Sequence, residues 1–435
     1  MKVGIVWFTT DLRLHDNETL VSAVEENDFV IPVYCWDKNF MNSTQKGFAR
    51  VGSHRKLFLK KALGELDAGL KDLGIRLVVA NQNPIEIFKE LTKKYKINKV
   101  YTKKQVGFEE KLTNEQVKNY LFSMGVDFQE YSTSTLYHPS DLPFSISSIP
   151  SVFTKFRKLA EKETAVRQPI SIPKDIKTVS HNLPLIDLQS KSIKHSVSPS
   201  LPNLGGEKSA LNHLRSYLYD SKSILHYKET RNELFGLDFS SKLSPWLSFG
   251  CLSPKFIYHE IKNFEREYEA NQSTYWLIFE LLWRDFFRFS FKKHPVDYFK
   301  LHGIVGNSSN TTQNNPDLIS QWINGKTSNN LVNASMIELK TTGWTSNRMR
   351  QIVASYFIHN LRQDWRIGAA YFEHILIDYD VSSNWGNWAY IAGVGNDPQS
   401  GRKFNLEKQE ELYDKDKKYQ RLWLEKTLYH DSKVL

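Results

Sequence analysis

The chain has 435 residues, a formal net charge of +10 and an aromatic content of 13%. Its length allows two or three domains, and its charge favours a polyanionic partner, nucleic acid before an acidic membrane. A basic surface without such a partner would give the same charge. Cys35 and Cys251 are the only cysteines, which excludes a disulfide framework and a four-cysteine iron–sulfur cluster within one chain.

Membrane and export signals are not evident in the sequence. No apolar run approaches the length of a membrane span, and the first residues form a strand-like run rather than a signal or transit pattern. Two widely separated cysteines suit a reducing compartment. We therefore expect a monomeric cytoplasmic protein with no membrane partner and no metal site.

Residues 1–135 alternate between buried-strand and amphipathic-helix patterns, which predicts a doubly wound α/β domain with a parallel sheet. Neither a GxGxxG turn nor a Walker A loop occurs there, so a Rossmann-type dinucleotide site is not predicted. The predicted strands cover 3–7, 29–36, 76–80 and 99–102, and the predicted helices cover 19–26, 56–73, 84–94 and 113–124.

Residues 136–203 are rich in proline, serine and lysine, which is typical of an interdomain connection over the surface. One short basic helix is predicted within it at 151–162. Over 204–435 the β patterning fades and amphipathic helices take over, which predicts an all-α domain.

The segment 377–398 combines acids, amides, tryptophans and glycines with little helical periodicity. Glycine lets the backbone approach a flat ligand closely, and amides and carboxylates match the edge of a flavin or a purine. A surface cluster of turns has a similar composition, so both interpretations stand on composition alone.

Two further motifs suit a site. Ser244 before Pro245 predicts an N-cap, and a helix N-terminus can bind a pyrophosphate; Ser253-Pro254 repeats the pattern without a functional need. The residues of 276–287 at helical spacing place an acid, an indole and a guanidinium on one face, although an ordinary Glu–Arg pair beside core aromatics would look the same.

The wording of these motifs resembles the cryptochrome/photolyase family, and most of all its cryptochrome-DASH branch. The resemblance rests on 382–388 and 393–398, and on 7–17, where Thr9 replaces the usual arginine. It spans nearly the whole chain outside 165–203. It implies FAD in the all-α domain and an antenna such as 5,10-methenyltetrahydrofolate in the α/β domain, with Glu110, or its neighbour Glu109, at the antenna position.

The same resemblance implies the residues that hold FAD. Arg350 would pair with Asp378 across the flavin ring, Asp380 would hydrogen-bond its uracil-like edge, and Asn384 would lie opposite N5. The full set is Tyr227, Ser240, Ser241, Lys242, Leu243, Ser244, Arg284, Arg350, Asp378, Asp380 and Asn384.

A pocket for damaged DNA is also implied, with Glu280, Trp283 and Asn347 as its catalytic residues. Asn347 stands where (6-4) photolyases have histidine, which points to cyclobutane pyrimidine dimers. Gln351 and Tyr390 replace the methionine and tryptophan of ordinary dimer photolyases. This weaker stacking pocket favours single-stranded DNA, whose bases are already unstacked.

Electron transfer to the flavin uses three tryptophans in relatives. Trp388 and Trp365 match the first two, but Thr312 stands at the third position. Either another aromatic such as Trp322 completes the path, or photoreduction is impaired. Asn333 replaces the family's usual aspartate, and the sequence offers no account of that change.

The predicted function is blue-light repair of cyclobutane pyrimidine dimers in single-stranded DNA by electron transfer from reduced FAD, a deoxyribodipyrimidine photolyase-type lyase reaction. Non-specific binding to duplex DNA or RNA is a further expectation. The alternative is a blue-light photoreceptor that binds nucleic acid without repairing it. A plain FAD-dependent oxidoreductase is disfavoured, because no acid–base pair or nicotinamide site is evident.

Overall fold

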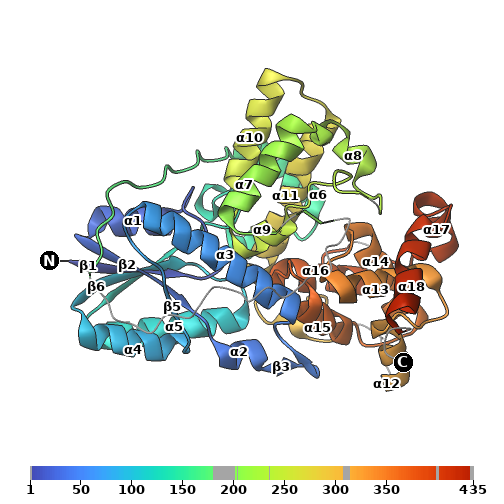
Figure 1. Cartoon of the computed structure of the whole chain (residues 1–435), viewed down its shortest axis with the longest axis horizontal. Helices are drawn as coiled ribbons and strands as arrows, with labels where there is room; N and C mark the ends of the chain where they lie inside the picture. Colours follow the sequence, from blue (N-terminus) through green and yellow to red (C-terminus); the bar gives the residue numbers. More distant parts are fainter. Residues whose placement is uncertain are drawn as a thin grey trace.

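The N-terminal part of this computed structural model is built on a five-stranded parallel sheet with the order β5-β2-β1-β6-β7 (Figure 1). The structure describes residues 2–179, 201–202, 204–234, 236–306, 314–397 and 401–431, with side chains to residue 425. Helices cover both faces of the sheet, so the predicted doubly wound α/β fold is confirmed. The strands are β1 (Val3–Phe8), β2 (Phe29–Cys35), β5 (Val78–Ala80), β6 (Ile97–Lys103) and β7 (Asp127–Tyr131).

Strand β7 was not predicted. It is an edge strand with the sequence Asp-Phe-Gln-Glu-Tyr, and none of its side chains is fully buried. Its polar residues therefore hide the apolar pattern on which the prediction relied. The helices of this part are α1 (Glu18–Glu26), α2 (Lys38–Asn42), α3 (Ser53–Asp72), α4 (Pro84–Lys94) and α5 (Phe108–Ser123), and a small hairpin joins β3 (Thr44–Gln45) to β4 (Phe48–Ala49).

The second part is mostly helical, as predicted. Within the connection, helix α6 (Phe153–Glu163) agrees with the predicted basic helix to within two residues. The helices that follow are α7 (Glu207–Arg215), α8 (Tyr227–Thr230), α9 (Ser244–Phe249), α10 (Pro254–Glu267), α11 (Gln272–Lys293), α12 (Pro316–Ile323), α13 (Asn330–Thr342), α14 (Asn347–Ser355), α15 (Trp365–Ile375), α16 (Val381–Ala392), α17 (Leu406–Tyr413) and α18 (Lys418–Asp431).

The reading of 377–398 as a run without helical order was wrong over α16, which lies in the middle of the helical part (Figure 1). Asp380 caps its start by accepting the Ser383 backbone N–H at 2.9 Å, and Gly393 ends it with φ +74°. Asn384, Trp385, Gly386 and Trp388 are all buried although they are spread around the helix. A helix buried on several sides has no amphipathic period, so the pattern could not reveal it.

One buried guanidinium joins the two parts and the connection between them. Arg13 donates to the carbonyl oxygens of His15 at 3.1 Å, Gly250 at 2.9 Å, Asp16 at 3.0 Å and Thr133 at 2.8 Å. These acceptors lie in the loop after β1, before α10 and after β7. Arg13 therefore fixes the relative position of three segments that are distant in the sequence.

Two general expectations can be compared with the fold. No helix among the described residues is long and apolar enough to cross a membrane. Neither Cys35 nor Cys251, both of which the structure describes, forms a disulfide.

We expect Arg13→Met to lower the free energy of unfolding by about 2–3 kcal/mol, because four buried carbonyl groups lose a charged donor. Denaturant unfolding measures the change. Arg76→Met is the matched control, since this exposed side chain reaches only Asp67 at 3.7 Å. Equal stability of the two variants would show that the Arg13 contacts do not hold the parts together.

Candidate functional site

A bidentate ion pair anchors the first group of predicted site residues. Arg350 donates to both carboxylate oxygens of Asp378, at 3.0 and 2.8 Å, and its Nε donates to the Thr345 carbonyl at 2.9 Å. Ser244 donates its hydroxyl to the same carboxylate at 2.6 Å. The predicted Arg350–Asp378 pair is thus present, and its two-pronged geometry is among the stronger hydrogen-bond arrangements in proteins.

The predicted N-cap role of Ser244 is wrong. Helix α9 begins at Ser244 itself, and the capping residue Leu243 makes no side-chain cap bond. The Ser244 hydroxyl instead donates to Asp378, and its position inside the helix rather than before it removes the cap geometry. Helix α9 has only six residues, and the binding of a pyrophosphate by the loop before it stays a prediction. Ser253 does cap α10, accepting from Phe256 N, as its sequence pattern predicts.

Lys242, in the loop before α9, is a buried cation. It has φ +52°, and its Nζ has no hydrogen-bond partner among the residues that the structure describes. The Nζ atom lies 3.0 Å from the ring centre of Phe239 and 4.4 Å from that of Trp344. Burial lowers the pKa of Lys242 well below its ordinary value. An unpaired buried ammonium is costly, so this position suits an anionic group.

The other residues predicted to hold FAD divide into two groups. Tyr227, Ser241 and Leu243 are buried and Ser240 is half-buried. Buried Asn384 is oriented by its amide, which donates to the Ala369 carbonyl at 2.9 Å. These residues lie in the helical part, as the ion pair does. Arg284 and Asp380 form the second group, because their side chains contact other segments of the protein.

Asp380 is placed at the boundary between the two parts. One carboxylate oxygen pairs with Arg288, and the other accepts from Ser382 at 2.5 Å and from Ser383 N at 2.9 Å. Burial would raise the pKa of Asp380, but Arg288, Arg284 and these hydrogen bonds outweigh it and hold the pKa well below its usual range. These contacts hold the carboxylate in a fixed orientation, and its predicted bond to a flavin edge stays a prediction.

Helix α11 carries the predicted catalytic acid and indole. Glu280 pairs with Arg231 at 2.6 Å rather than with Arg284 one turn later, so the ordinary i,i+4 pair is not formed. Burial raises the pKa of Glu280, and the Arg231 charge opposes this. Arg284 instead donates to the backbone carbonyls of Ser134 and, at 3.1 Å, Leu247. It therefore ties the segment after β7 to α9.

Trp283 of α11 lies in a group of aromatic side chains that includes Phe153 of the connection. Its ring stacks on Phe153 of α6 with centroids 3.7 Å apart and meets Tyr390 of α16 edge to face at 5.9 Å. Arg402 holds Tyr390 in place by donating to its hydroxyl at 2.7 Å, and Asp397 accepts from Arg402 at 2.6 Å. The structure thus brings together the two aromatic residues of the predicted lesion pocket.

The amide residues predicted for this pocket lie on α14. Asn347 is its first residue and is exposed, and Gln351 follows one turn later and is half-buried. No hydrogen bond between either side chain and Trp283 or Glu280 is present among the described residues. Their approach to a DNA base stays a prediction.

The two predicted electron-transfer tryptophans lie on neighbouring helices. Trp388 packs on Gly368, one turn after Trp365 in α15: a Cβ atom on that glycine would lie 2.2 Å from the indole. Trp388 also contacts Trp322, with ring centroids 6.2 Å apart. Thr312 lies outside the described residues.

Asn333 receives a structural account. Its side-chain oxygen accepts from the backbone and hydroxyl of Thr327, at 2.8 and 2.7 Å, and its amide donates to the Thr327 carbonyl at 2.9 Å. An amide can accept and donate in this way, whereas a carboxylate can only accept.

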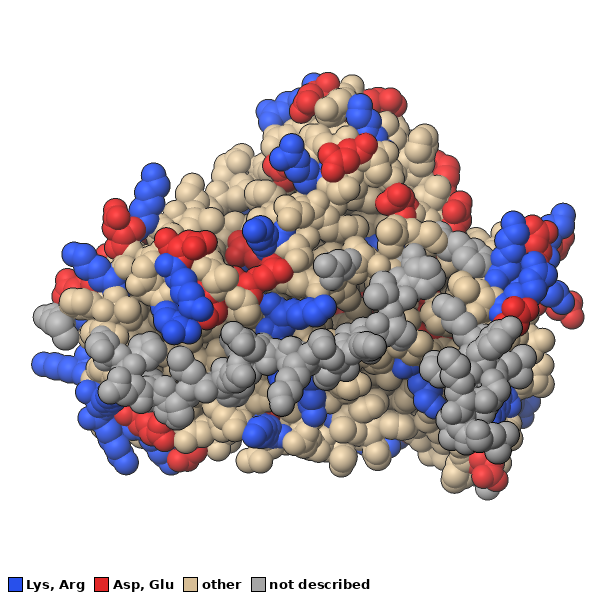
Figure 2. Space-filling view, in the orientation of Figure 1, with Lys and Arg blue, Asp and Glu red and all other residues tan. Residues whose placement is uncertain are grey.

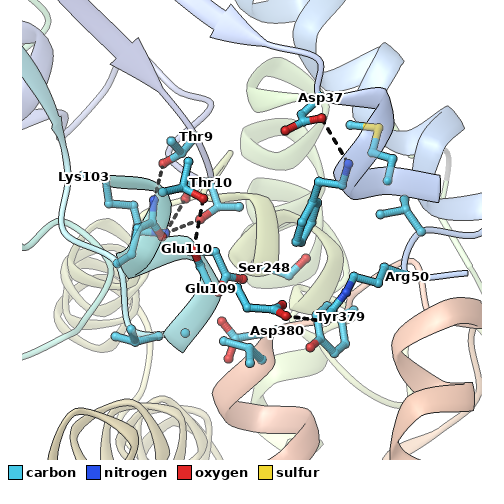
Figure 3. A pocket seen from close by; sticks show the side chains of 18 of the residues that line it. Thr9, Thr10, Asp37, Arg50, Lys103, Glu109, Glu110, Ser248, Tyr379 and Asp380 are labelled. Atoms are coloured by element: carbon cyan, nitrogen blue, oxygen red, sulfur yellow. Dashed lines mark hydrogen bonds and ion pairs between the residues drawn. The ribbon is translucent and has the colours of Figure 1, made fainter. Parts of the chain in front are cut away.

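A cavity of about 570 Å³ lies between the sheet and the helical part. Figure 3 shows Lys103 and Glu110 reaching it from the sheet side, and Tyr379 and Asp380 from the helical side. Burial and the Arg288 charge lower the pKa of Lys103 to about 7, and burial raises the pKa of Glu110. The cavity therefore offers both basic and acidic groups, and the predicted antenna residue Glu110 lines it.

Several residues of these sites were not predicted from the sequence. Arg288 and Glu373 carry the buried charges that face Asp380 and Arg50, and Trp344 lies between the Lys242 and Arg350 cations. The only signal in the sequence that could have pointed to Trp344 is its position just before residues 345–351, which include Asn347, Arg350 and Gln351. The charges depend on tertiary contacts that no local pattern encodes.

Charge over the molecular surface is mixed. On the face shown in Figure 2, basic and acidic side chains are interspersed over the described residues. The net charge of +10 is therefore not gathered into one large patch on this face. Within the described ranges, no group of three or more His, Cys, Asp or Glu side chains could hold a metal ion.

Two family models match the chain, DNA photolyase over residues 4–174 and the FAD binding domain of DNA photolyase over residues 276–434. A cryptochrome DASH from Synechocystis sp. is 41% identical over 432 residues, which cover 97% of this chain and 87% of that protein. The chain belongs to the cryptochrome DASH branch of the DNA photolyase family. Tyr227 and the 240–244 loop lie before residues 276–434, which match the model of the FAD binding domain of DNA photolyase.

Solved structures agree with the cryptochrome DASH assignment. The crystal structure of the Synechocystis cryptochrome has a TM-score of 0.93 at 41% identity, covering 98% of this chain and 89% of that one. An archaeal photolyase from Sulfolobus tokodaii with two FAD molecules has a TM-score of 0.80 at 26% identity, covering 97% and 90%. The predicted family and its FAD-binding domain are confirmed.

We expect Gly368→Ala to destabilise the protein by about 1–3 kcal/mol, because the new methyl group must displace the buried Trp388 ring. Thermal or denaturant unfolding measures the loss. Gly64→Ala in α3 is the matched control, since a Cβ atom there meets nothing within 4 Å. A Gly368→Ala protein as stable as this control would contradict the close packing.

Proposed function

We propose that this chain is a deoxyribodipyrimidine photolyase-type lyase that repairs cyclobutane pyrimidine dimers in single-stranded DNA with blue light and reduced FAD. The observation that carries the proposal is the edge-to-face meeting of Trp283 and Tyr390 at 5.9 Å. An indole and a phenol set edge to face beside each other can offer stacking surfaces to an extruded base. Its action as a cytoplasmic monomer stays a prediction.

FAD would be held by Tyr227, the 240–244 loop, the Arg350–Asp378 pair and Asn384. The buried Lys242 Nζ, which lacks an acceptor in the described part of the chain, supports an anionic group such as the FAD diphosphate. When bound, reduced FAD supplies the electron that light transfers to the dimer. The chain supplies binding and orientation, and no nucleophile is required.

Glu280 would act on the dimer from α11. Burial raises the pKa of its carboxyl group, although Arg231 opposes the effect. A carboxyl group that retains its proton more readily can donate to a base carbonyl as negative charge accumulates on the dimer. This favours Glu280 as the stabilising group and Trp283 as the stacking surface beneath the base.

Single-stranded DNA is favoured by the pocket wall. Tyr390 has a smaller aromatic face than tryptophan, and Arg402 and Asp397 engage its polar end. Base–aromatic stacking contributes roughly 1–3 kcal/mol per base, which is similar to the cost of unstacking and unpairing a base. A reduced stacking gain therefore suits bases that are already outside a duplex. Weaker, non-specific binding to duplex DNA or RNA is part of the same proposal.

The interdomain cavity is proposed as the site of an antenna chromophore, 5,10-methenyltetrahydrofolate. Glu110 lines it, and its pKa is raised by burial. A carboxyl group at this position suits the N–H groups of a pteridine edge. The archaeal relative with two FAD molecules supports a second chromophore in this fold.

We expect Trp283→Ala to weaken binding of dimer-containing single strands by about 1–3 kcal/mol while leaving intact thymine strands unchanged. Titration of both strands with wild-type and variant protein measures this. Trp283→Phe is the matched control, because it retains an aromatic face. Glu280→Ala should keep binding but lower the number of dimers repaired per absorbed photon.

Repair of a dimer-containing single strand by the wild type, measured after chemical reduction of FAD, is the direct test of function. If wild-type protein neither prefers a dimer over intact thymines nor repairs it, the proposal is wrong. A light-dependent protein that still bound nucleic acid would then be a photoreceptor of the alternative kind.

We expect Glu110→Ala to weaken binding of 5,10-methenyltetrahydrofolate by about tenfold or more, the loss typical of a hydrogen bond to a charged group. Absorption titration of the purified flavoprotein with this folate measures the affinity. Glu115→Ala, on the exposed side of α5, is the control. Identical affinities for the two variants would argue against folate at Glu110.

A further inference from the structure

The third position of the electron-transfer path holds threonine, and the aromatic contacts of the described residues offer a replacement. The ring of Trp365 contacts a further tryptophan, Trp385, with ring centroids 5.8 Å apart and an angle of 74° between the ring planes. Trp385 lies in α16 next to Asn384 and is 1% exposed. An electron leaving Trp385 therefore cannot be replaced directly from solvent.

Trp385 is connected to a residue that reaches the interdomain cavity. Its indole N–H donates to the Tyr379 hydroxyl and to a Glu373 carboxylate oxygen, both at 3.3 Å. Tyr379 is partly exposed and lines the cavity, where Figure 3 shows it beside Arg50. A tyrosine in this position touches both the buried indole and a space open to small molecules.

We propose that Tyr379, acting through Trp385, is the terminal electron donor for light-driven reduction of the flavin in this chain. The inference rests on the proposed function, because it concerns how the FAD reaches its reduced state. It assigns the interdomain cavity a second use, as the entry of the reductant.

With FAD bound, Trp388 would supply one electron to the photoexcited oxidised flavin, and Trp365, Trp385 and Tyr379 would replace it in turn. Tyr379 loses its phenolic proton to water in the cavity and becomes a neutral radical. A soluble thiol that enters the cavity returns one hydrogen atom to the phenol oxygen and is itself oxidised to a thiyl radical.

The competing branch through Trp322 lacks such an exit. Trp322 contacts Trp388 at 6.2 Å and Tyr371 at 5.6 Å, but it is 0% exposed and Tyr371 is only 4% exposed. If either ring were oxidised, a soluble reductant could not reach it. The electron would then return from the flavin to the oxidised ring. The geometry therefore favours Tyr379 over Tyr371.

The test uses the FAD-loaded full chain, a soluble thiol and blue light, without DNA. Tyr379→Phe should slow flavin photoreduction, followed by absorption, at least tenfold, and should abolish a transient tyrosyl-radical signal. Tyr371→Phe is the matched control and should change neither. Tyr379→Trp should restore photoreduction, because an indole can also donate an electron.

Equal photoreduction rates in wild type and Tyr379→Phe, or a loss in Tyr371→Phe, would overturn the proposal. Flavin content and circular dichroism exclude misfolding as the cause of a slow rate, since phenylalanine keeps the ring over which Arg55 lies at 4.6 Å. Repair by chemically reduced wild type tests the proposed function separately, because it bypasses photoreduction.

Discussion

The proposed lesion pocket depends on a buried carboxylate that joins helix α11 to the interdomain connection. Asp285 accepts the backbone N–H groups of Leu136 and Tyr137, each at 2.9 Å. Burial raises the pKa of Asp285 to about 7, although these two hydrogen bonds oppose the shift. The contact fixes the connection against α11, and the connection in turn carries Phe153, on which Trp283 stacks. The aromatic pocket is thus assembled from segments that a single polar contact holds in register.

Much of this architecture could be predicted because local hydrophobic patterns in the sequence indicate its strands and helices. The alternation of buried strands with amphipathic helices identified the α/β part, and the family resemblance implied the Arg350–Asp378 pair that the structure contains. Trp283 and Tyr390, 107 positions apart in the numbering, could be assigned to one pocket only through the family resemblance. Periodicity alone would have left each as a core aromatic residue.

The misses have a common physical origin in tertiary contacts that replace local ones. Ser244 stands before proline, as helix caps often do, but its hydroxyl donates a hydrogen bond to Asp378, 134 residues later. Asp380 was predicted at the flavin edge, but its pairing with Arg288 and its capping of α16 were not foreseen. A single polar side chain has more than one satisfactory partner, and the sequence does not say which of them will be near. Strand β7 and helix α16 were missed for the related reason that their burial does not follow a simple period.

The position of Arg13 has a consequence for how the chain folds during synthesis. One of its acceptors, the Gly250 carbonyl, is 237 residues further along the chain. The sheet part emerges from the ribosome first, at roughly 5–20 residues per second, so this guanidinium waits for about ten seconds or longer before its last acceptor exists. Until then the loop after β1 must remain hydrated and open. The two parts should therefore complete their folding together, late in translation, rather than as independent units.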